Sequence, residues 1–218
     1  MIKEVEKRVL SSIILIPLVF YFILKGSFFF LFFLTICFLI TSYEWYMMSK
    51  KKLYHLYGYL FLVFSFYSAY KLRGAEDSGL IIFLLIIIIC ISTDLGGYVC
   101  GKIFKGPKLT KISPNKTYSG MIGSYVFSIT STYILIINSN FFGFDNAFFT
   151  FELFSAVIII STISQIGDLT ISYFKRLSGI KDTGKIIPGH GGMLDRIDGM
   201  IFAFPATYSY VLFKLSIS

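Results

Sequence analysis

Long apolar stretches, separated by short polar segments, run through the whole chain. Each is about 16 to 20 residues long, close to the roughly 20 residues with which an α-helix crosses a bilayer. The fold class expected is therefore all-α, a polytopic bundle of helices in the membrane. We predict seven membrane helices, at Val9–Leu24, Ser27–Tyr43, Leu53–Tyr70, Gly79–Tyr98, Met121–Ile137, Phe148–Gly167 and Gly199–Leu215.

The first apolar run follows Lys3, Lys7 and Arg8, as the core of a signal peptide would. No small-residue cleavage site comes after it, and a second apolar run begins almost at once. We therefore expect an uncleaved membrane anchor. We divide the chain into N-terminal anchoring helices, residues 1–90, and a catalytic membrane domain with two long polar loops, residues 91–218.

Composition supports the membrane assignment and excludes several other classes. Hydrophobic residue types make up 56% of the chain and charged types 15%, whereas soluble domains have about 25% charged residues. Mean hydropathy is +0.75, which excludes a disordered or collagenous chain. The cysteines at 37, 90 and 100 have no metal-binding or redox spacing, and only two histidines are present. We expect small buried cysteines rather than a zinc site.

Lysine and arginine are unevenly distributed along the chain. The formal net charge is +8, and sixteen of the twenty basic residues fall in alternate connecting segments. The positive-inside rule places those segments in the cytoplasm, so we expect a cytoplasmic N-terminus and an external C-terminus. Two of the cytoplasmic segments, Val99–Gly120 and Asp168–Asp198, are long. The expected location is the cell membrane, as a multi-pass protein of a bacterial inner membrane, and the basic excess is not taken to indicate nucleic-acid binding.

Four aspartates stand out because a carboxylate in a membrane helix is costly and usually functional. Asp94 lies late in the fourth predicted helix and Asp168 ends the sixth, while Asp195 and Asp198 open the seventh on one helix face. All four are expected at the cytoplasmic side. Helix capping or a bond to a neighbouring helix would explain any one of them. Together, Asp168, Asp195 and Asp198 suit Mg²⁺ bound along with substrate phosphates.

Basic residues are interleaved with these aspartates and with glycines. Lys175, Arg176, Lys181 and Lys185 precede a Pro-Gly-His-Gly-Gly run whose backbone amides can approach a ligand closely. Lys116 lies in another polar segment rich in hydrogen-bond donors. A solvated loop attracted to anionic lipid is the simpler explanation, but it does not account for the interleaving. No Walker-type phosphate-binding run is present, which excludes a P-loop protein.

Residues Ser172–Asp198 read SYFKRLSGIKDTGKIIPGHGGMLDRID. This segment closely resembles the signature of the phosphatidate cytidylyltransferases, also called CDP-diacylglycerol synthases. The resemblance covers roughly Asp94–Gly199, and the chain departs from it at Ser119 and Ile171, where many members carry Glu. Every fixed position of the signature is filled, by Ser172, Lys175, Arg176, Lys181, Asp182, Pro188, His190, Gly191, Gly192, Asp195, Arg196 and Asp198.

The resemblance implies transfer of a cytidylyl group from CTP to phosphatidic acid, giving CDP-diacylglycerol and pyrophosphate. It implies Mg²⁺ as cofactor, with a monovalent cation as an optional second ion. The implied partners are CTP, phosphatidic acid and the lipid bilayer; a homodimer is left open. Because the lipid phosphate is largely dianionic at neutral pH, no protein nucleophile is needed. The protein's tasks are in-line positioning and neutralisation of charge.

Site roles follow from the resemblance in three groups. The catalytic group is Lys175, Arg176, Lys181, Asp182, His190 and Arg196. The substrate-binding group is Asp94, Ser113, Asn115, Lys116, Thr117, Ser172, Gly191 and Gly192. The metal ligands are Asp168 and Asp195, with Asp198 adjacent to them. His190 is either an acid on the leaving group or a hydrogen-bond donor, and we favour the donor.

Three other functions are consistent with part of the pattern. A CDP-alcohol phosphatidyltransferase also uses aspartates at the membrane face, but its D-G-x-x-A-R arrangement is absent. A CTP-dependent polyprenol kinase shares the nucleotide and would transfer the γ-phosphoryl group instead. A cation channel or transporter would place its polar residues near the bilayer midplane, whereas this chain concentrates them at one face.

Overall fold

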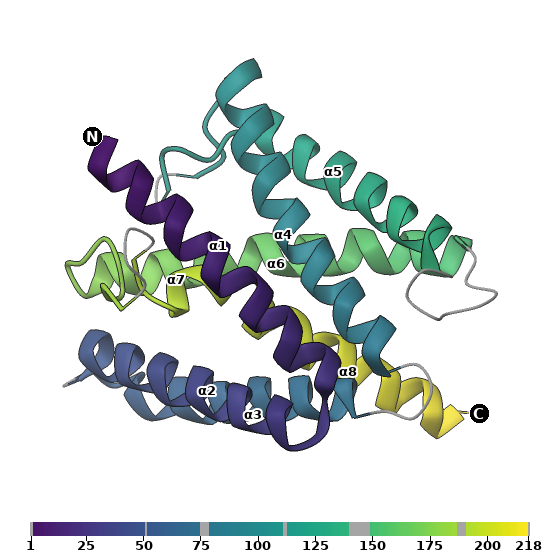
Figure 1. Ribbon diagram of the computed structural model, residues 1–218. Coiled ribbons are helices and arrows are strands. Elements are labelled where there is room, and N and C mark those ends of the chain that lie inside the picture. Colours follow the sequence, from purple (N-terminus) through teal and green to yellow (C-terminus); the bar gives the residue numbers. More distant parts are fainter. Residues whose placement is uncertain are drawn as a thin grey trace.

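The apolar runs of the sequence form helices throughout the residues that the computed structural model describes, which are 2–50, 52–74, 79–110, 113–139, 149–186 and 191–217. Among these residues there is no strand, only one isolated bridge. The all-helical fold class is thereby confirmed. The helices are α1 (Ile2–Lys25), α2 (Ser27–Ser49), α3 (His55–Arg73), α4 (Gly79–Phe104), α5 (Tyr118–Ile137), α6 (Phe151–Leu177), α7 (Leu194–Ile197) and α8 (Met200–Ile217) (Figure 1).

Each of the seven predicted apolar runs overlaps one long helix, and the short α7 is additional. Among the described residues, α2, α4, α5 and α6 are long and apolar enough to cross a membrane. The apolar part of α1 whose side chains are described, Ile13–Lys25, is shorter. The protein is therefore a multi-pass membrane protein, and the crossing of all seven long helices stays a prediction.

Several helices extend beyond their predicted ends, and this corrects part of the sequence interpretation. The second predicted helix ended at Tyr43, but α2 continues to Ser49. The fourth predicted helix ended at Tyr98, but α4 continues to Phe104. The sixth was expected to end at Asp168, but α6 continues to Leu177, so Asp168 lies inside a helix. In α6 the polar residues of the last turns are bonded inside the protein, Ser172 to Asp168 and Lys175 to Asp195. In α4 the added last residues, Lys102, Ile103 and Phe104, are exposed. The fall in hydropathy therefore marked a change of surroundings and not a break in the backbone.

Figure 1 shows α2 and α3 side by side on one flank of the bundle and α4 against α5 on the other, with α6 and α8 between them. The start of α1, the segment before α5 and the region of α7 lie at one end. The C-terminal end of α8 lies at the opposite end. The predicted cytoplasmic segments thus share one end of the bundle, which we call the polar end.

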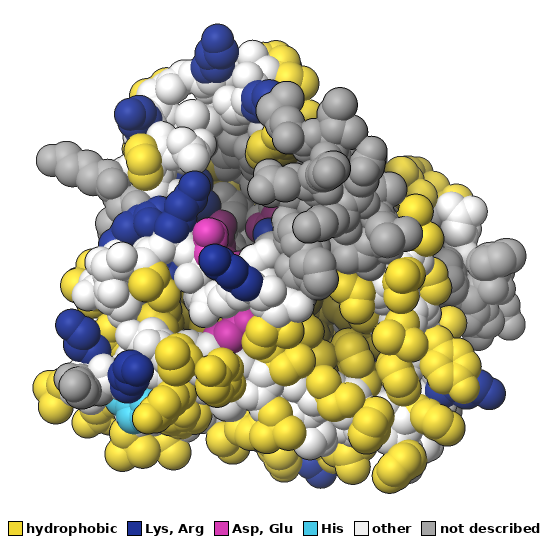
Figure 2. Space-filling model, turned by 60° about the vertical axis from the view of Figure 1, so that its left-hand side comes forward, with side chains coloured by type: hydrophobic (Ala, Val, Ile, Leu, Met, Phe, Trp, Pro, Cys, Tyr) yellow, Lys and Arg dark blue, Asp and Glu magenta, His cyan; other side chains and the backbone are white. Residues whose placement is uncertain are grey.

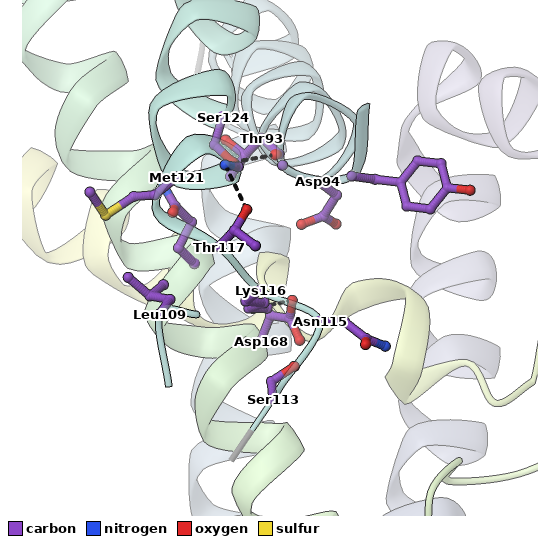
Figure 3. Close-up of a pocket in the computed structure, with 14 residues that line it drawn as sticks. Thr93, Asp94, Leu109, Ser113, Asn115, Lys116, Thr117, Met121, Ser124 and Asp168 are labelled. Carbon is purple, nitrogen blue, oxygen red and sulfur yellow. Dashed lines mark hydrogen bonds and ion pairs between the residues drawn. The ribbon is translucent and has the colours of Figure 1, made fainter. Parts of the chain in front are cut away.

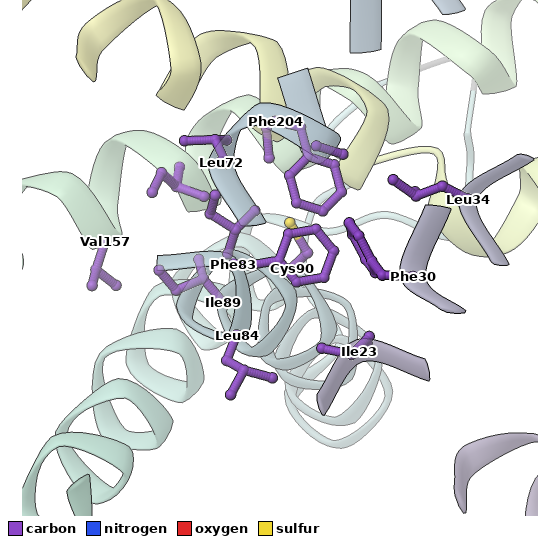
Figure 4. Close-up of a cluster of buried hydrophobic side chains, with 14 residues drawn as sticks. Ile23, Phe30, Leu34, Leu72, Phe83, Leu84, Ile89, Cys90, Val157 and Phe204 are labelled. Atoms are coloured by element: carbon purple, nitrogen blue, oxygen red, sulfur yellow. The ribbon is translucent and has the colours of Figure 1, made fainter. Parts of the chain in front are cut away.

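The main apolar core fills the half of the bundle away from the polar end. The Phe83 ring stacks on Phe204 at 5.0 Å and meets Phe30 edge-on at 5.2 Å (Figure 4). Ile89 and Cys90 of α4 are 1% exposed in the same cluster. Many other large apolar side chains point outward. The outward apolar surface is what a bilayer requires, since lipid-facing positions gain nothing from polar side chains.

Helices α4 and α5 approach closely through glycines. A Cβ on Gly96 would lie 2.4 Å from the carbonyl oxygen of Gly123, and a Cβ on Gly120 would lie 2.7 Å from that of Gly97. Any larger residue at these places would push the two backbones apart. Small residues are the usual means of close helix packing in membranes. This contact sets the first turns of α5 beside the polar part of α4.

Candidate active site

A cavity of about 270 Å³ lies at the polar end, between α4, α5 and α6. Five of the eight predicted substrate-binding residues line it, namely Asp94, Ser113, Asn115, Lys116 and Thr117, whereas Ser172, Gly191 and Gly192 do not. Asp168 of α6 closes the opposite wall, and Figure 3 shows the carboxylates of Asp94 and Asp168 on either side of this space. The structure therefore brings together residues from three separate parts of the chain, as the sequence analysis anticipated for a site at one membrane face.

The segment between α4 and α5 folds back on itself and delivers Lys116 to the cavity. Lys108 and Thr117 form an isolated antiparallel bridge, and the Leu109 N–H donates to the Lys116 carbonyl at 2.8 Å. Thr117 caps α5, because its Oγ1 accepts from the Gly120 N–H at 3.1 Å. With the backbone fixed on both sides, the Lys116 ammonium forms an ion pair with Asp168.

Three carboxylates, Asp94, Asp168 and Asp198, lie within one another's electrostatic field. Asp198 follows α7 and is 6% exposed, and its Oδ1 accepts from the Gly199 N–H at 2.8 Å. Burial raises the pKa of the Asp198 carboxyl well above its ordinary value, and the negative charges of Asp168 and Asp94 raise it further. The three carboxylates would repel one another when ionised, and a cation between them would relieve that repulsion.

Asp195 has different surroundings from the other three aspartates. Its Oδ1 pairs with the Lys175 ammonium at 2.8 Å. Its Oδ2 accepts from the backbone N–H groups of Thr183 at 2.8 Å and Gly192 at 3.2 Å. Burial raises the pKa of the Asp195 carboxyl, but the Lys175 ammonium and the two N–H groups outweigh it and leave the pKa below its ordinary value. Asp195 is therefore an ionised, fully bonded carboxylate.

The α6 residues of the signature share one helix with Asp168. Ser172 is buried, and its hydroxyl donates to Asp168 Oδ1 at 3.3 Å, one helical turn away. Lys175 is 9% exposed and faces Asp195. Arg176 is exposed and donates to the Ile180 carbonyl at 3.3 Å. Lys175 and Arg176 were expected in a loop, and the extended α6 instead fixes both on the last turns of a helix.

The rest of the signature lies on the loop after α6 and around α7. Lys181 and Asp182 are exposed, as is Arg196, which lies within electrostatic reach of Asp94. Gly191 has a φ of 90°, in the region that favours glycine. His190, predicted as an acid on the leaving group or, as we favoured, a hydrogen-bond donor, lies outside the described residues. Figure 2 shows acidic side chains recessed behind Lys and Arg side chains on this face of the molecule.

The aspartates of the site offer oxygen donors of the kind that Mg²⁺ prefers. Within the part of the chain that the structure describes, no group of three His, Cys, Asp or Glu side chains is placed to hold a metal ion as the side chains stand. The chemistry nevertheless fits, because Asp94, Asp168 and Asp198 are hard oxygen donors that repel one another across a shared site. The expected pairing of Asp168 with Asp195 on one ion stays a prediction.

One functional candidate, Glu44 of α2, was missed by the sequence analysis. Its carboxylate is 1% exposed and accepts from the Thr183 hydroxyl, the Met193 N–H and the Leu194 N–H. The signal was available: a lone acid follows directly on the apolar run Ser27–Tyr43. It was passed over because the N-terminal helices were regarded only as anchors.

Fold and site together define an integral membrane protein with an acidic and basic site at one end of a helical bundle. Residues 53–214, about three quarters of the chain, match the cytidylyltransferase family. The protein belongs to that family and is an enzyme, as the resemblance in the signature segment predicted.

Curated relatives support the same assignment. The phosphatidate cytidylyltransferase of Rickettsia felis is 37% identical over 223 residues, covering 99% of this chain and 93% of the relative. That of Rickettsia conorii is 37% identical and covers 89% of this chain and 85% of the relative. That of Brucella melitensis is 36% identical over 70% of this chain and 55% of its own length. The similarity thus extends into the N-terminal helices, beyond the segment where the resemblance was first seen.

Proposed function

We propose that this protein transfers CMP from CTP to phosphatidate, giving CDP-diacylglycerol and pyrophosphate. The relatives that carry this name align with nearly the whole chain. The observation that carries the proposal is the cavity at the polar end, where Asp94, Lys116 and Asp168 converge. A water-soluble nucleotide and a membrane lipid can meet only at such a surface.

The reaction needs orientation and charge neutralisation more than it needs a protein nucleophile. The lipid phosphate, whose second pKa is about 6, attacks the α-phosphorus of CTP with one of its own oxygens. The bond between that phosphorus and the bridging oxygen to the β-phosphate breaks, and pyrophosphate leaves with the electron pair. Both events involve only phosphate oxygens, so the protein acts by holding the two groups in line.

The basic side chains divide into two sets by their surroundings. Lys116 lines the cavity and is paired with Asp168. When Asp168 binds Mg²⁺ instead, the Lys116 ammonium is placed to contact nucleotide phosphates. Lys175 is buried against Asp195 and holds its charge at a fixed place. Arg176, Lys181 and Arg196 are exposed and can follow pyrophosphate or the lipid head group. We assign His190 the role of a hydrogen-bond donor.

Asp168 and Asp198 would hold Mg²⁺, with Asp94 beside them, since these carboxylates share one field. When bound, Mg²⁺ neutralises charge on the nucleotide phosphates. Asp195, also predicted as a ligand, serves in this proposal as the partner of Lys175, because both its oxygens are already bonded. We place the polar end in the cytoplasm, where CTP is available and where the basic segments belong.

The test uses purified protein with phosphatidate-containing mixed micelles and CTP labelled in either the α- or the γ-phosphate. We expect label from the α-phosphate in the lipid product and label from the γ-phosphate in free pyrophosphate, each requiring both substrates. Lys116→Met should abolish both signals, whereas Lys52→Met, in the run of three lysines at 50–52 between α2 and α3, should leave them unchanged. Appearance of γ-label in lipid would instead establish a kinase and overturn the proposal.

A further inference from the structure

We propose that Glu44 of α2 is a positioning residue, which holds the loop after α6 and the start of α7 so that Asp195 and Lys175 keep their places at the site. The proposal rests on the proposed cytidylyltransferase function and adds a residue to it. Glu44 precedes the residues that match the family, 53–214. Its role is therefore inferred from the contacts of this chain alone.

The Glu44 carboxylate lies between two segments that are distant in sequence. Oε1 accepts from the Met193 N–H at 2.9 Å. Oε2 accepts from the Leu194 N–H at 2.8 Å and from the Thr183 hydroxyl at 2.9 Å. One side chain of α2 thus joins the loop after α6 to the first turn of α7. A buried carboxylate is stable only with such a set of donors.

Two glycines allow the carboxylate to approach so closely. A Cβ on Gly184 would lie 2.7 Å from Glu44 Oε1. A Cβ on Gly192 would lie 2.7 Å from Glu44 Oε2 and 2.1 Å from Thr183 Oγ1. Both glycines would clash with the carboxylate if they carried any side chain. The backbone of the loop therefore packs directly against the Glu44 carboxylate, and this packing requires glycine at both positions.

The contacts continue from Glu44 to the site. Thr183 Oγ1 is also 3.1 Å from Asp195 Oδ2, and the Thr183 and Gly192 N–H groups bond that same oxygen. The hydroxyl has one proton to share between the two carboxylates. Asp195 in turn fixes the Lys175 ammonium at 2.8 Å. Glu44 therefore touches no substrate and acts through Thr183 on a charged pair of the site.

The test combines Glu44→Gln with Thr183→Val, and uses Glu152→Gln as the matched control. Gln keeps the size of the side chain but turns an NH₂ group toward one of the donors. Val keeps the shape of threonine and removes the hydroxyl. Glu152 is an exposed acid at the other end of α6, paired with Lys214 at 3.5 Å, and its change should leave activity at the wild-type level.

We expect Glu44→Gln and Thr183→Val each to lower kcat by about 10-fold or more, with the KM for CTP changed less than about threefold. Thr183→Ser, which restores the hydroxyl, should recover most of the kcat. The double variant should be scarcely worse than either single variant, since both break one chain of contacts. A merely structural Glu44 would lower the yield of folded enzyme and leave kcat per folded molecule intact, and that result would overturn the proposal.

Limited trypsin digestion provides a readout that does not depend on the reaction. Lys181 and Lys185 lie on the loop that Glu44 holds, so Glu44→Gln should speed cleavage there several-fold relative to wild type and Glu152→Gln. Equal cleavage rates would contradict the anchoring. If the wild type shows no CMP transfer, the proposed function fails by itself, and the digestion still decides whether Glu44 anchors the loop.

Discussion

Asp168 and Asp195 carry the same charge on adjoining elements, yet their surroundings assign them different tasks. Asp168 borders a cavity and is held by Lys116 and the Ser172 hydroxyl. Asp195 is bonded at both oxygens by Lys175 and by backbone N–H groups. The surroundings of Asp168 suit a carboxylate that exchanges partners during a reaction. Those of Asp195 suit a carboxylate that orients a lysine.

This difference gives a prediction for the metal requirement. Asp168→Asn should lower kcat/KM by at least about 100-fold, roughly 2.7 kcal/mol of barrier, and should raise the Mg²⁺ concentration needed for half-maximal rate. Asp195→Asn should lose activity to a similar extent without changing the Mg²⁺ requirement, because it loosens Lys175. The measurement is a Mg²⁺ titration of the initial rate of each variant. If both variants needed more Mg²⁺ for half-maximal rate, the result would support the prediction from the sequence that Asp168 and Asp195 share one ion.

The two lysines of the signature loop offer a test with an internal control. Lys181 and Lys185 are both exposed on the loop after α6, but only Lys181 is a fixed position of the signature. We expect Lys181→Gln to lower turnover more than about 10-fold, because a phosphate contact is lost, while Lys185→Gln stays near wild type. The same purified preparations should show equal folded yields. Equal turnover in the two variants would assign both lysines to ordinary cytoplasmic charge.

At the scale of elements, hydropathy predicted where helices lie better than where they end. All seven apolar runs overlap long helices, and the signature segment led to the correct family. The end of α6 was wrong by nine residues because Asp168, Ser172 and Lys175 face the site from inside a helix. The contacts of Glu44 lie 139 and 150 positions away along the chain. No local pattern can encode such pairings, so this part of the site needed the structure.

Among contacts between helices, the close packing of α4 against α5 is the one that we expect to be most sensitive to mutation. Gly96→Ala would place a Cβ 2.4 Å from the Gly123 carbonyl oxygen, and overpacking of this kind costs about 1–3 kcal/mol. We expect a melting temperature lower by roughly 3–10 °C in detergent, with a loss of activity because Asp94 lies two residues away. Ile91→Ala, at a position 52% exposed on the same helix, should change the melting temperature little. Comparable melting of the two variants would show that the helices have room to separate.

At the scale of the whole molecule, most of the basic residues and the candidate site lie at the same end of the bundle. The polar end holds the segments that contain most of the lysines and arginines, and the C-terminus lies at the opposite end (Figure 1). A site at the surface gives CTP access from water, while phosphatidate can enter sideways from the leaflet. Outward apolar side chains along the helices provide the surface that contacts lipid.

We predict an odd number of crossings, seven in all, and this can be tested directly. If the seven long helices all cross, a reporter joined after Ser218 is outside the cell membrane, whereas one inserted at Gly106, in the segment between α4 and α5, is in the cytoplasm. We expect alkaline phosphatase to be active at Ser218 and inactive at Gly106, with a fluorescent protein giving the opposite pattern. The positive-inside bias supplies the physical reason, since basic segments resist translocation. Fluorescence at both positions would mean an even number of crossings between Gly106 and Ser218, so that one of the helices α5, α6 and α8 does not cross.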